Sequence, residues 1–183
     1  MECRLSFKRV LVDGTILSVL LSMLIYGSIR VDPLMWVGDY PPDIQAAVGP
    51  VEVPPGRAVV VGLLFLGAII GVVLRSNGKL RRQNGGKLSF LTAFANSALI
   101  LFFFAVWDLL IVDWLVFVTI RPDFVVIPGT EGLAGYDDYW FHFEVSFLGW
   151  TQWISILASG LMMAGLSMIR PGGGRVGALS VPD

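Results

Sequence analysis

The chain has 183 residues, of which 55% are hydrophobic and only 15% charged, and its formal net charge is −1. This composition, with a mean hydropathy of +0.75, is too apolar for an ordinary soluble domain and indicates an integral membrane protein. No basic excess points to a nucleic-acid partner. A single cysteine and a single histidine exclude an internal disulfide, a bis-histidine haem and a multi-histidine zinc site, so we expect no cofactor and no bound metal.

Four apolar runs follow one another along the chain, and each is near or above the length that a helix needs to cross a bilayer core. They cover residues 10–30, 57–74, 89–120 and 145–169. Polar segments rich in Gly, Pro or charge separate them, at residues 31–56, 75–88 and 121–144. The sequence therefore predicts one all-α membrane domain, a bundle of four transmembrane helices with two ordered loops on the outer side.

The first run has a basic start that is also typical of a cleaved signal peptide. No small-x-small cleavage site precedes Asp32, so we expect the helix to be retained. Asp13, near its inner end, is either a proton carrier or, as we favour, an interfacial residue paired with Lys8 or Arg9. In the loop that follows, "DIQAA" predicts a short helix with Asp43 as its N-cap.

The basic residues predict the orientation, because Lys and Arg in short loops stay on the cytoplasmic side of the membrane. Ten of the thirteen lie on one side of the predicted bundle: Arg4, Lys8, Arg9, Arg75, Lys79, Arg81, Arg82, Lys87, Arg170 and Arg175. We therefore expect both termini in the cytoplasm and the protein in the plasma membrane, most simply the bacterial inner membrane. Small residues in "GAIIG" (67–71), and Gly160 with Ala164, allow close helix packing.

The third run ends in "WDLLIVDW", residues 107–114, which places two aspartates in an apolar helix. An unbroken helix over 88–120 would be about 49 Å long, beyond a core of roughly 30 Å, so it must tilt, protrude or break. At about 100° per residue, Trp107 and Trp114 share one face, while Asp108 and Asp113 lie about 140° apart on the other side. Nearer the inner side, Asn96 is expected to form an interhelical hydrogen bond.

The partners of these aspartates decide between two interpretations. Only Arg30, Arg57 and Arg121 are expected on the outer side, each at a helix end. Arginine pairs with carboxylates through two parallel hydrogen bonds, so we favour an interhelical clamp between these arginines and the aspartates. The alternative is that Asp108 and Asp113 handle protons or bind a ligand.

The second outer loop ends in "GYDDYWFHFE", a dense group of aromatic and acidic residues. Its aromatic residues, with Tyr40 of the first loop, either anchor the protein at the interface or form the wall of a pocket for an amphiphile; they are Tyr136, Tyr139, Trp140 and Phe141. His142 is the only side chain that titrates near neutral pH without a large shift. It is a structural residue or, with a neighbouring carboxylate, a catalytic one.

Three hypotheses for function follow. The first is a small membrane protein that binds a lipid or a partner protein at its outer face without turnover, through Arg30, Arg57, Arg121, Tyr136, Asp137, Asp138 and Trp140. The second is a membrane enzyme that acts on an amphiphile, with His142, Asp108 and Asp113 as its catalytic groups. The third is a proton-coupled transporter or pore subunit, which needs a homo-oligomer or a partner membrane protein because four helices enclose little space.

Overall fold

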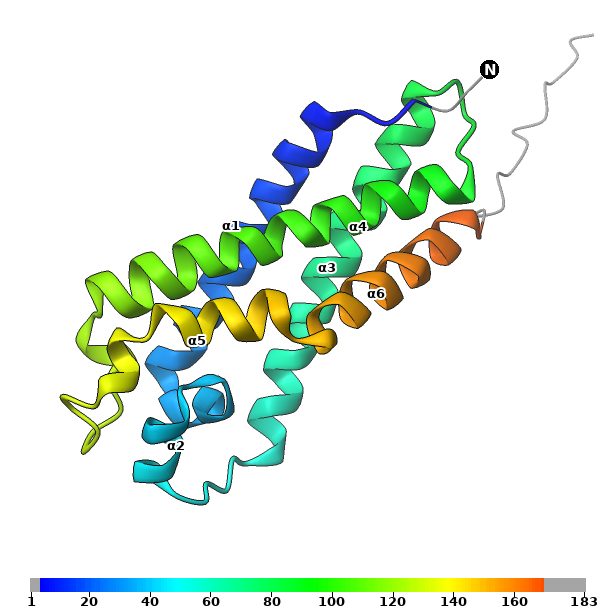
Figure 1. The fold of residues 1–183 in the computed structure, drawn as a ribbon. Helices are drawn as coiled ribbons and strands as arrows, with labels where there is room; N and C mark the ends of the chain where they lie inside the picture. The colour runs from blue at the N-terminus through cyan, green and yellow to red at the C-terminus, as the bar shows by residue number, and fades with distance from the viewer. Residues whose placement is uncertain (1–3, 170–183) are drawn as a thin grey trace, which may run out of the picture.

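The computed structural model describes residues 4–169, and its long helices are arranged side by side (Figure 1). They are α1 (Phe7–Val31), α3 (Pro55–Gln83), α4 (Phe90–Trp107), which continues as the π-helical segment η2 (Asp108–Ile120), and α6 (Trp150–Met168). The shorter elements are η1 (Pro33–Asp39), α2 (Pro42–Val48), η3 (Asp123–Val125), η4 (Ala134–Asp137), α5 (Tyr139–Phe143) and the π-helical η5 (Glu144–Leu148). The described chain is thus helical, as the sequence predicts.

Three continuous helices are long and apolar enough to cross a membrane, at Phe7–Val31, Pro55–Gln83 and Phe90–Ile120. A fourth span is present if Tyr139–Leu148 and Trp150–Met168 are taken together, and these two parts are bent by 46°. The predicted fourth run, residues 145–169, covers the second of these parts and the end of the first, and nothing in the sequence indicated the bend. The bend lies at Gly149, where an extended residue interrupts the helical backbone.

The segment 75–88 is mostly helix and not loop. α3 runs on to Gln83, because Arg and Lys are good helix formers and four of the basic residues lie within its last turns. The turn itself contains Gly85 and Gly86, both with positive φ, which glycine adopts without strain. The backbone N–H of Arg4 donates to Asn84 Oδ1 at 3.0 Å, which ties the N-terminal segment to this turn.

The start of α1, the turn between α3 and α4, and the end of α6 lie at one end of the molecule (Figure 1). We call this the inner end, and the opposite end, which carries α2 and residues 121–138, the outer end. This segregation is the one that the charge pattern predicts; the orientation in a membrane stays a prediction, and Arg170 and Arg175 lie outside the described residues.

The main core joins all four long helices, through Leu17 and Leu21 of α1, Val73 of α3, Ile100 of α4 and Met163 of α6. Glycines allow the helices to approach closely at two points. A Cβ at Gly14 would lie 2.8 Å from the ring of Phe103, and one at Gly160 would lie 3.2 Å from Phe94. The predicted close packing at Gly160 is thereby confirmed.

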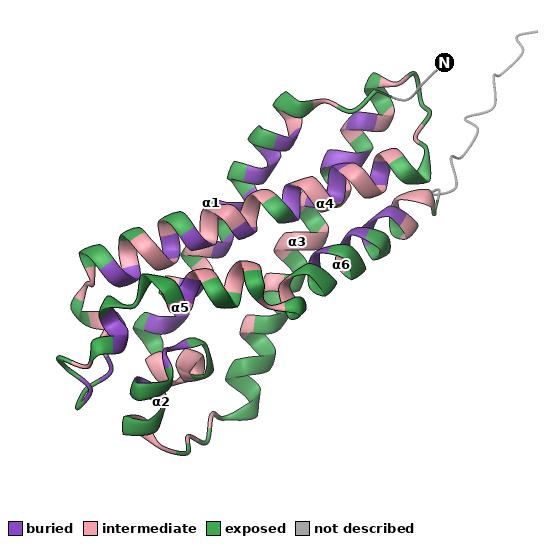
Figure 2. Cartoon of the chain, viewed as in Figure 1, coloured by how far each residue is buried: buried purple, intermediate pink, exposed green. Residues whose placement is uncertain are grey.

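The "GAIIG" prediction is wrong for contacts within this chain, since Gly67 and Gly71 face open space. The outer half of α3 is exposed along most of its length (Figure 2).

Buried polar residues bind the inner halves of the helices to one another. Asn96 Nδ2 donates to Ser76 Oγ at 3.0 Å and to Asn77 Oδ1 at 2.9 Å, so the predicted interhelical hydrogen bond of Asn96 is confirmed. Asp13 is buried and lies 3.6 Å from Lys79 Nζ. The sequence led us to expect a partner on the same helix, but Lys79 belongs to α3.

Candidate functional site

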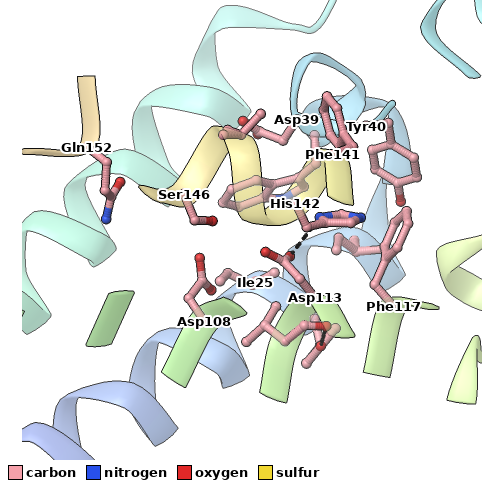
Figure 3. A pocket seen from close by; sticks show the side chains of 15 residues that line it. Ile25, Asp39, Tyr40, Asp108, Asp113, Phe117, Phe141, His142, Ser146 and Gln152 are labelled. Carbon is pink, nitrogen blue, oxygen red and sulfur yellow. Dashed lines mark hydrogen bonds and ion pairs between the residues drawn. The ribbon is translucent and has the colours of Figure 1, made fainter. Parts of the chain in front are cut away.

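The aspartates of "WDLLIVDW" lie where the helix winding changes. α4 ends at Trp107, and from Asp108 the backbone follows the wider π-helical pattern. In a π-helix each N–H bonds to the carbonyl five residues earlier, so residues i and i+5 lie about one turn apart. Asp108 and Asp113 are five apart, and the π winding directs both toward the same cavity (Figure 3). Their predicted separation of about 140° assumed an α-helix and was wrong for that reason.

The same winding separates the two tryptophans that were expected to share a face. Trp107 Nε1 donates to Ser22 Oγ of α1 at 3.2 Å, whereas Trp114 Nε1 donates to the carbonyl of Tyr139 at 3.1 Å. The segment ends at Ile120 and is followed by Arg121, the only described residue other than glycine with a positive φ, at 44°. A side chain in this region of φ is strained, and three hydrogen bonds of its guanidinium group hold it there.

A cavity of about 220 Å³ lies between the outer parts of α1, η1, η2, α5, η5 and α6. Its polar lining consists of three carboxylates, one imidazole and two neutral groups, contributed by Asp39, Asp108, Asp113, His142, Ser146 and Gln152. Its aromatic lining consists of Tyr26, Trp36, Tyr40, Phe117 and Phe141. Apolar walls with a few convergent polar groups are typical of ligand-binding sites.

His142 is buried at the cavity wall and paired with Asp113. Its Nδ1 lies 3.4 Å from Asp113 Oδ1, and only 5% of the residue is exposed. Its ring packs edge-on against Phe117 and Phe141, with centroids 4.9 and 5.4 Å away. Asp138 accepts a hydrogen bond from the N–H of Phe141 at 2.9 Å and so caps the short helix that carries the histidine. The three predicted catalytic candidates, His142, Asp108 and Asp113, are thus brought together.

Two buried polar atoms at this site have no hydrogen-bond partner in the described chain, Asp108 Oδ1 and His142 Nε2. A buried group without a partner costs roughly 1–3 kcal/mol, so such groups need an explanation in water, an ion or a ligand. The hydroxyl of Tyr26, by contrast, donates to the carbonyl of Val112 at 2.8 Å.

The two outer loops form a cap over the cavity. Tyr40 is buried in the cap and donates its hydroxyl to the carbonyl of Val125 at 2.9 Å, and this burial raises its pKa. Asp39 lies beside it at the rim, where partial desolvation raises the pKa of its carboxyl and the nearby Asp113 carboxylate adds to the increase. Trp36 is held at the rim by a 2.8 Å hydrogen bond from its Nε1 to Ser28 Oγ.

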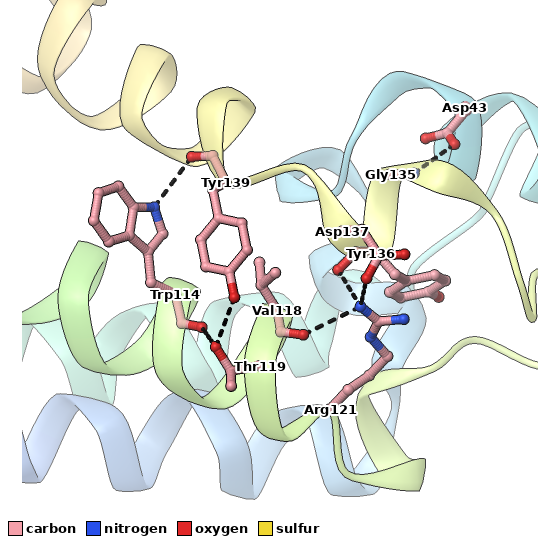
Figure 4. A network of polar contacts seen from close by, with 9 residues as sticks. All are labelled: Asp43, Trp114, Val118, Thr119, Arg121, Gly135, Tyr136, Asp137 and Tyr139. Atoms are coloured by element: carbon pink, nitrogen blue, oxygen red, sulfur yellow. Dashed lines mark hydrogen bonds and ion pairs between the residues drawn. The ribbon is translucent and has the colours of Figure 1, made fainter.

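We had expected Asp43 to cap α2, but it joins the two loops instead. Its Oδ2 accepts a hydrogen bond from the backbone N–H of Gly135 at 2.8 Å, while Pro41 occupies the N-cap position (Figure 4).

The three outer arginines do not form the favoured clamp with Asp108 and Asp113. Arg57 Nη1 pairs with Asp32 at 2.8 Å, and the guanidinium group of Arg30 lies 5.6 Å from the ring centroid of Phe124. Arg121 donates to the carbonyls of Val118 and Tyr136, at 3.1 and 2.7 Å, and pairs with Asp137 (Figure 4). All three arginines thus contact groups of the outer loops, and none of them lines the cavity.

The other predicted ligand-binding residues also lie outside the cavity. Tyr136 is buried in the cap, where its hydroxyl accepts a hydrogen bond from the N–H of Ile127 at 2.9 Å. Trp140 is 62% exposed, beside a shallow cleft formed with Trp114, Tyr139 and Phe143. The predicted aromatic wall is therefore divided: Tyr40 and Phe141 line the cavity, and the remaining aromatic residues support the cap or lie at the surface.

Sequence reasoning did not select Asp39, Tyr26, Trp36, Ser146 or Gln152, which also line the cavity. A carboxylate directly before a buried tyrosine in "GDYPP" was the one available signal. Ser146 and Gln152 gave none; they lie on either side of the break at Gly149.

Among residues 4–169, no group of three or more His, Cys, Asp or Glu side chains is placed to hold a metal ion. No protein family, curated protein or solved structure matches this chain.

Proposed function

We propose that this chain is a membrane protein that binds an amphiphilic molecule in its outer cavity. The observation that carries the proposal is the position of Asp108, Asp113 and His142 in one cavity with aromatic walls. The polar head of an amphiphile would lie against these three groups, and its apolar part against the aromatic residues. This is the lipid-binding form of the first hypothesis, with the cavity in place of the outer arginines.

The edge of the cavity supports entry from the side. Val145 lines the cavity, yet 52% of it is exposed, and Leu148 and Trp150 next to it are exposed as well. In a bilayer, exposed apolar side chains of a spanning helix face lipid. The cavity is small beside the roughly 300–1,000 Å³ of typical ligand sites, so the chain of an amphiphile would continue along this exposed surface.

A partner protein is supported less well, because the residues expected to bind it are engaged within the chain. Arg57 and Arg121 each pair with a carboxylate of the loops, and Asp138 caps α5.

The test uses the chain in phosphatidylcholine nanodiscs and three twelve-carbon probes: dodecylamine, dodecanol and dodecyl sulfate. We expect saturable binding of at least one probe by calorimetry, and none to empty nanodiscs. Ser146→Phe should fill the cavity and abolish binding. Ser155→Phe adds the same ring at an exposed position of α6 outside the cavity lining and should leave binding intact. Absence of saturable binding for all three probes, or equal binding by the two variants, would contradict the proposal.

A membrane enzyme that transfers protons is a second candidate, favoured by the pairing of His142 with Asp113. A carboxylate that orients an imidazole from one side leaves the other ring nitrogen to accept or donate a proton, and Asp108 supplies a second acid in the same cavity. The test compares vesicles of total bacterial lipid after incubation with the wild-type chain or with His142→Gln. A lipid product seen by mass spectrometry only with the wild type supports the enzyme, and identical lipid profiles argue against it.

A further inference from the structure

The cavity walls carry three carboxyl groups and no lysine or arginine. Asp39, Asp108 and Asp113 line the cavity, and its lining contains neither Lys nor Arg. His142 is the only residue of the lining that can carry a positive charge, and it lies beside Asp113 at 3.4 Å, so Asp39 and Asp108 have no cationic partner in the lining.

The described arginines of the outer end are engaged elsewhere. Arg57 pairs with Asp32, Arg121 with Asp137, and Arg30 lies over Phe124. A cationic occupant would therefore supply the counter-charge that these arginines do not place in the cavity.

Asp108 is the group that most requires a donor. Its Oδ1 is buried and has no hydrogen-bond partner in the described chain. A carboxylate in an apolar, membrane-spanning segment is costly unless a cation or an N–H donor compensates it. In Figure 3 the carboxylates of Asp108 and Asp113 and the hydroxyl of Ser146 point into the same part of the cavity, which all three residues line.

The aromatic walls favour the same kind of group. Tyr26, Trp36, Tyr40 and Phe117 line the cavity beside the carboxylates. The faces of aromatic rings attract cations, and this attraction is stronger where water is excluded from the contact. Carboxylates combined with several aromatic rings are suited to an ammonium head, and the same carboxylates repel a phosphate or sulfate head.

We propose that the outer cavity binds a cationic amphiphile, whose ammonium head pairs with Asp108 and Asp113 while its apolar chain leaves past Val145. This inference rests on the proposed function and specifies the chemical class of its ligand. The volume of about 220 Å³ suits an ammonium head with its first few carbons. The organic cation is preferred over a metal ion because the lining carboxylates of the described chain do not form a metal-ligand group.

The three nanodisc probes test the charge preference on the unmodified chain. Dodecylamine is cationic at pH 7, since alkylamines resemble lysine in pKa. We expect it to bind about tenfold to a hundredfold more tightly than dodecanol, as a charge-assisted hydrogen bond implies, and dodecyl sulfate to bind most weakly. If none of the three probes binds saturably, the proposed function itself is refuted. If the probes bind saturably but dodecanol or dodecyl sulfate has the same affinity as dodecylamine, only the inference about charge is overturned.

A matched pair of variants then locates the preference. Asp108→Asn should bring the ratio of dodecylamine to dodecanol affinity close to one. Asp123→Asn removes the same charge from an exposed acid outside the cavity lining and should keep the wild-type ratio. An equal loss of preference in both variants would show general surface attraction and overturn the assignment. If Asp108→Asn does not elute as a folded species from a sizing column, Asp113→Asn takes its place with the same expectation.

Discussion

Gly135 is the position where one added methyl group should open the cap. A Cβ there would lie 2.7 Å from Pro41 Cβ, closer than real side chains approach, and would also collide with the carboxylate of Asp43. The Asp43 side chain can rotate away, but the ring of Pro41 is fixed in the backbone. Gly135→Ala must therefore push α2 away from η4 and break the 2.8 Å hydrogen bond between Gly135 N–H and Asp43 Oδ2.

The expected cost has two parts. Overpacking a tight contact costs about 1–3 kcal/mol, and losing a hydrogen bond to a charged group costs about 1.5–3 kcal/mol. Together they predict a loss of about 2.5–6 kcal/mol in the free energy that keeps the cap closed. The amides of Ile44 and Gln45, which bond to the carbonyl of Pro41 at 3.1 Å, should then exchange with solvent about sixtyfold faster or more.

The assay is hydrogen–deuterium exchange of the peptide that contains α2, measured in detergent by mass spectrometry. Gly38→Ala is the matched control. Gly38 lies in the neighbouring element η1, and a Cβ there would meet nothing within 4 Å. Asp43→Ala removes the hydrogen bond without the collision and should give an intermediate rate. Equal exchange rates in Gly135→Ala and Gly38→Ala would refute the claim that this contact closes the cap.

Three further predictions concern stability, each measured as the free energy of unfolding in mixed micelles. Tyr136→Phe should lose about 1–3 kcal/mol, because it leaves the buried N–H of Ile127 without an acceptor; no change would show that this N–H finds another partner. Asn96→Leu should lose about 1 kcal/mol through its two interhelical hydrogen bonds, and a gain in stability would mean that apolar packing outweighs them. Because partial desolvation and Asp113 raise the pKa of Asp39, the folded state keeps this proton to a higher pH than the unfolded chain, so stability should fall as pH rises from the ordinary aspartate range through the raised pKa. Asp39→Asn should flatten that part of the pH profile, and an unchanged profile would count against the shift.

Several features of this chain followed from local composition. A long run of apolar residues favours a helix through its own composition, so the long apolar helices were predictable within a few residues at most ends. Asn96 was predictable as an interhelical residue because an amide in an apolar helix needs a partner. His142, Asp108 and Asp113 were identifiable as candidates for the same reason: polar groups in apolar surroundings require compensation.

The partners of those groups were not predictable, because they depend on contacts between distant segments. The three outer arginines were available to Asp108 and Asp113 by location alone, yet loop carboxylates such as Asp32 and Asp137 lie nearer to them in the folded chain. The cap shows the same dependence, since Asp43 and Gly135 are separated by 92 positions.

The sequence by itself determined an apolar helical chain with acidic residues near one end, because hydropathy and charge act locally. Only the tertiary structure decided that Asp108 and Asp113 face the same cavity. An α-helix would have turned them about 140° apart, whereas the π winding of η2 places them about one turn apart. That winding coincides with contacts from other elements, including the hydroxyl of Tyr26 on the carbonyl of Val112, and such contacts are not encoded in the local pattern "WDLLIVDW".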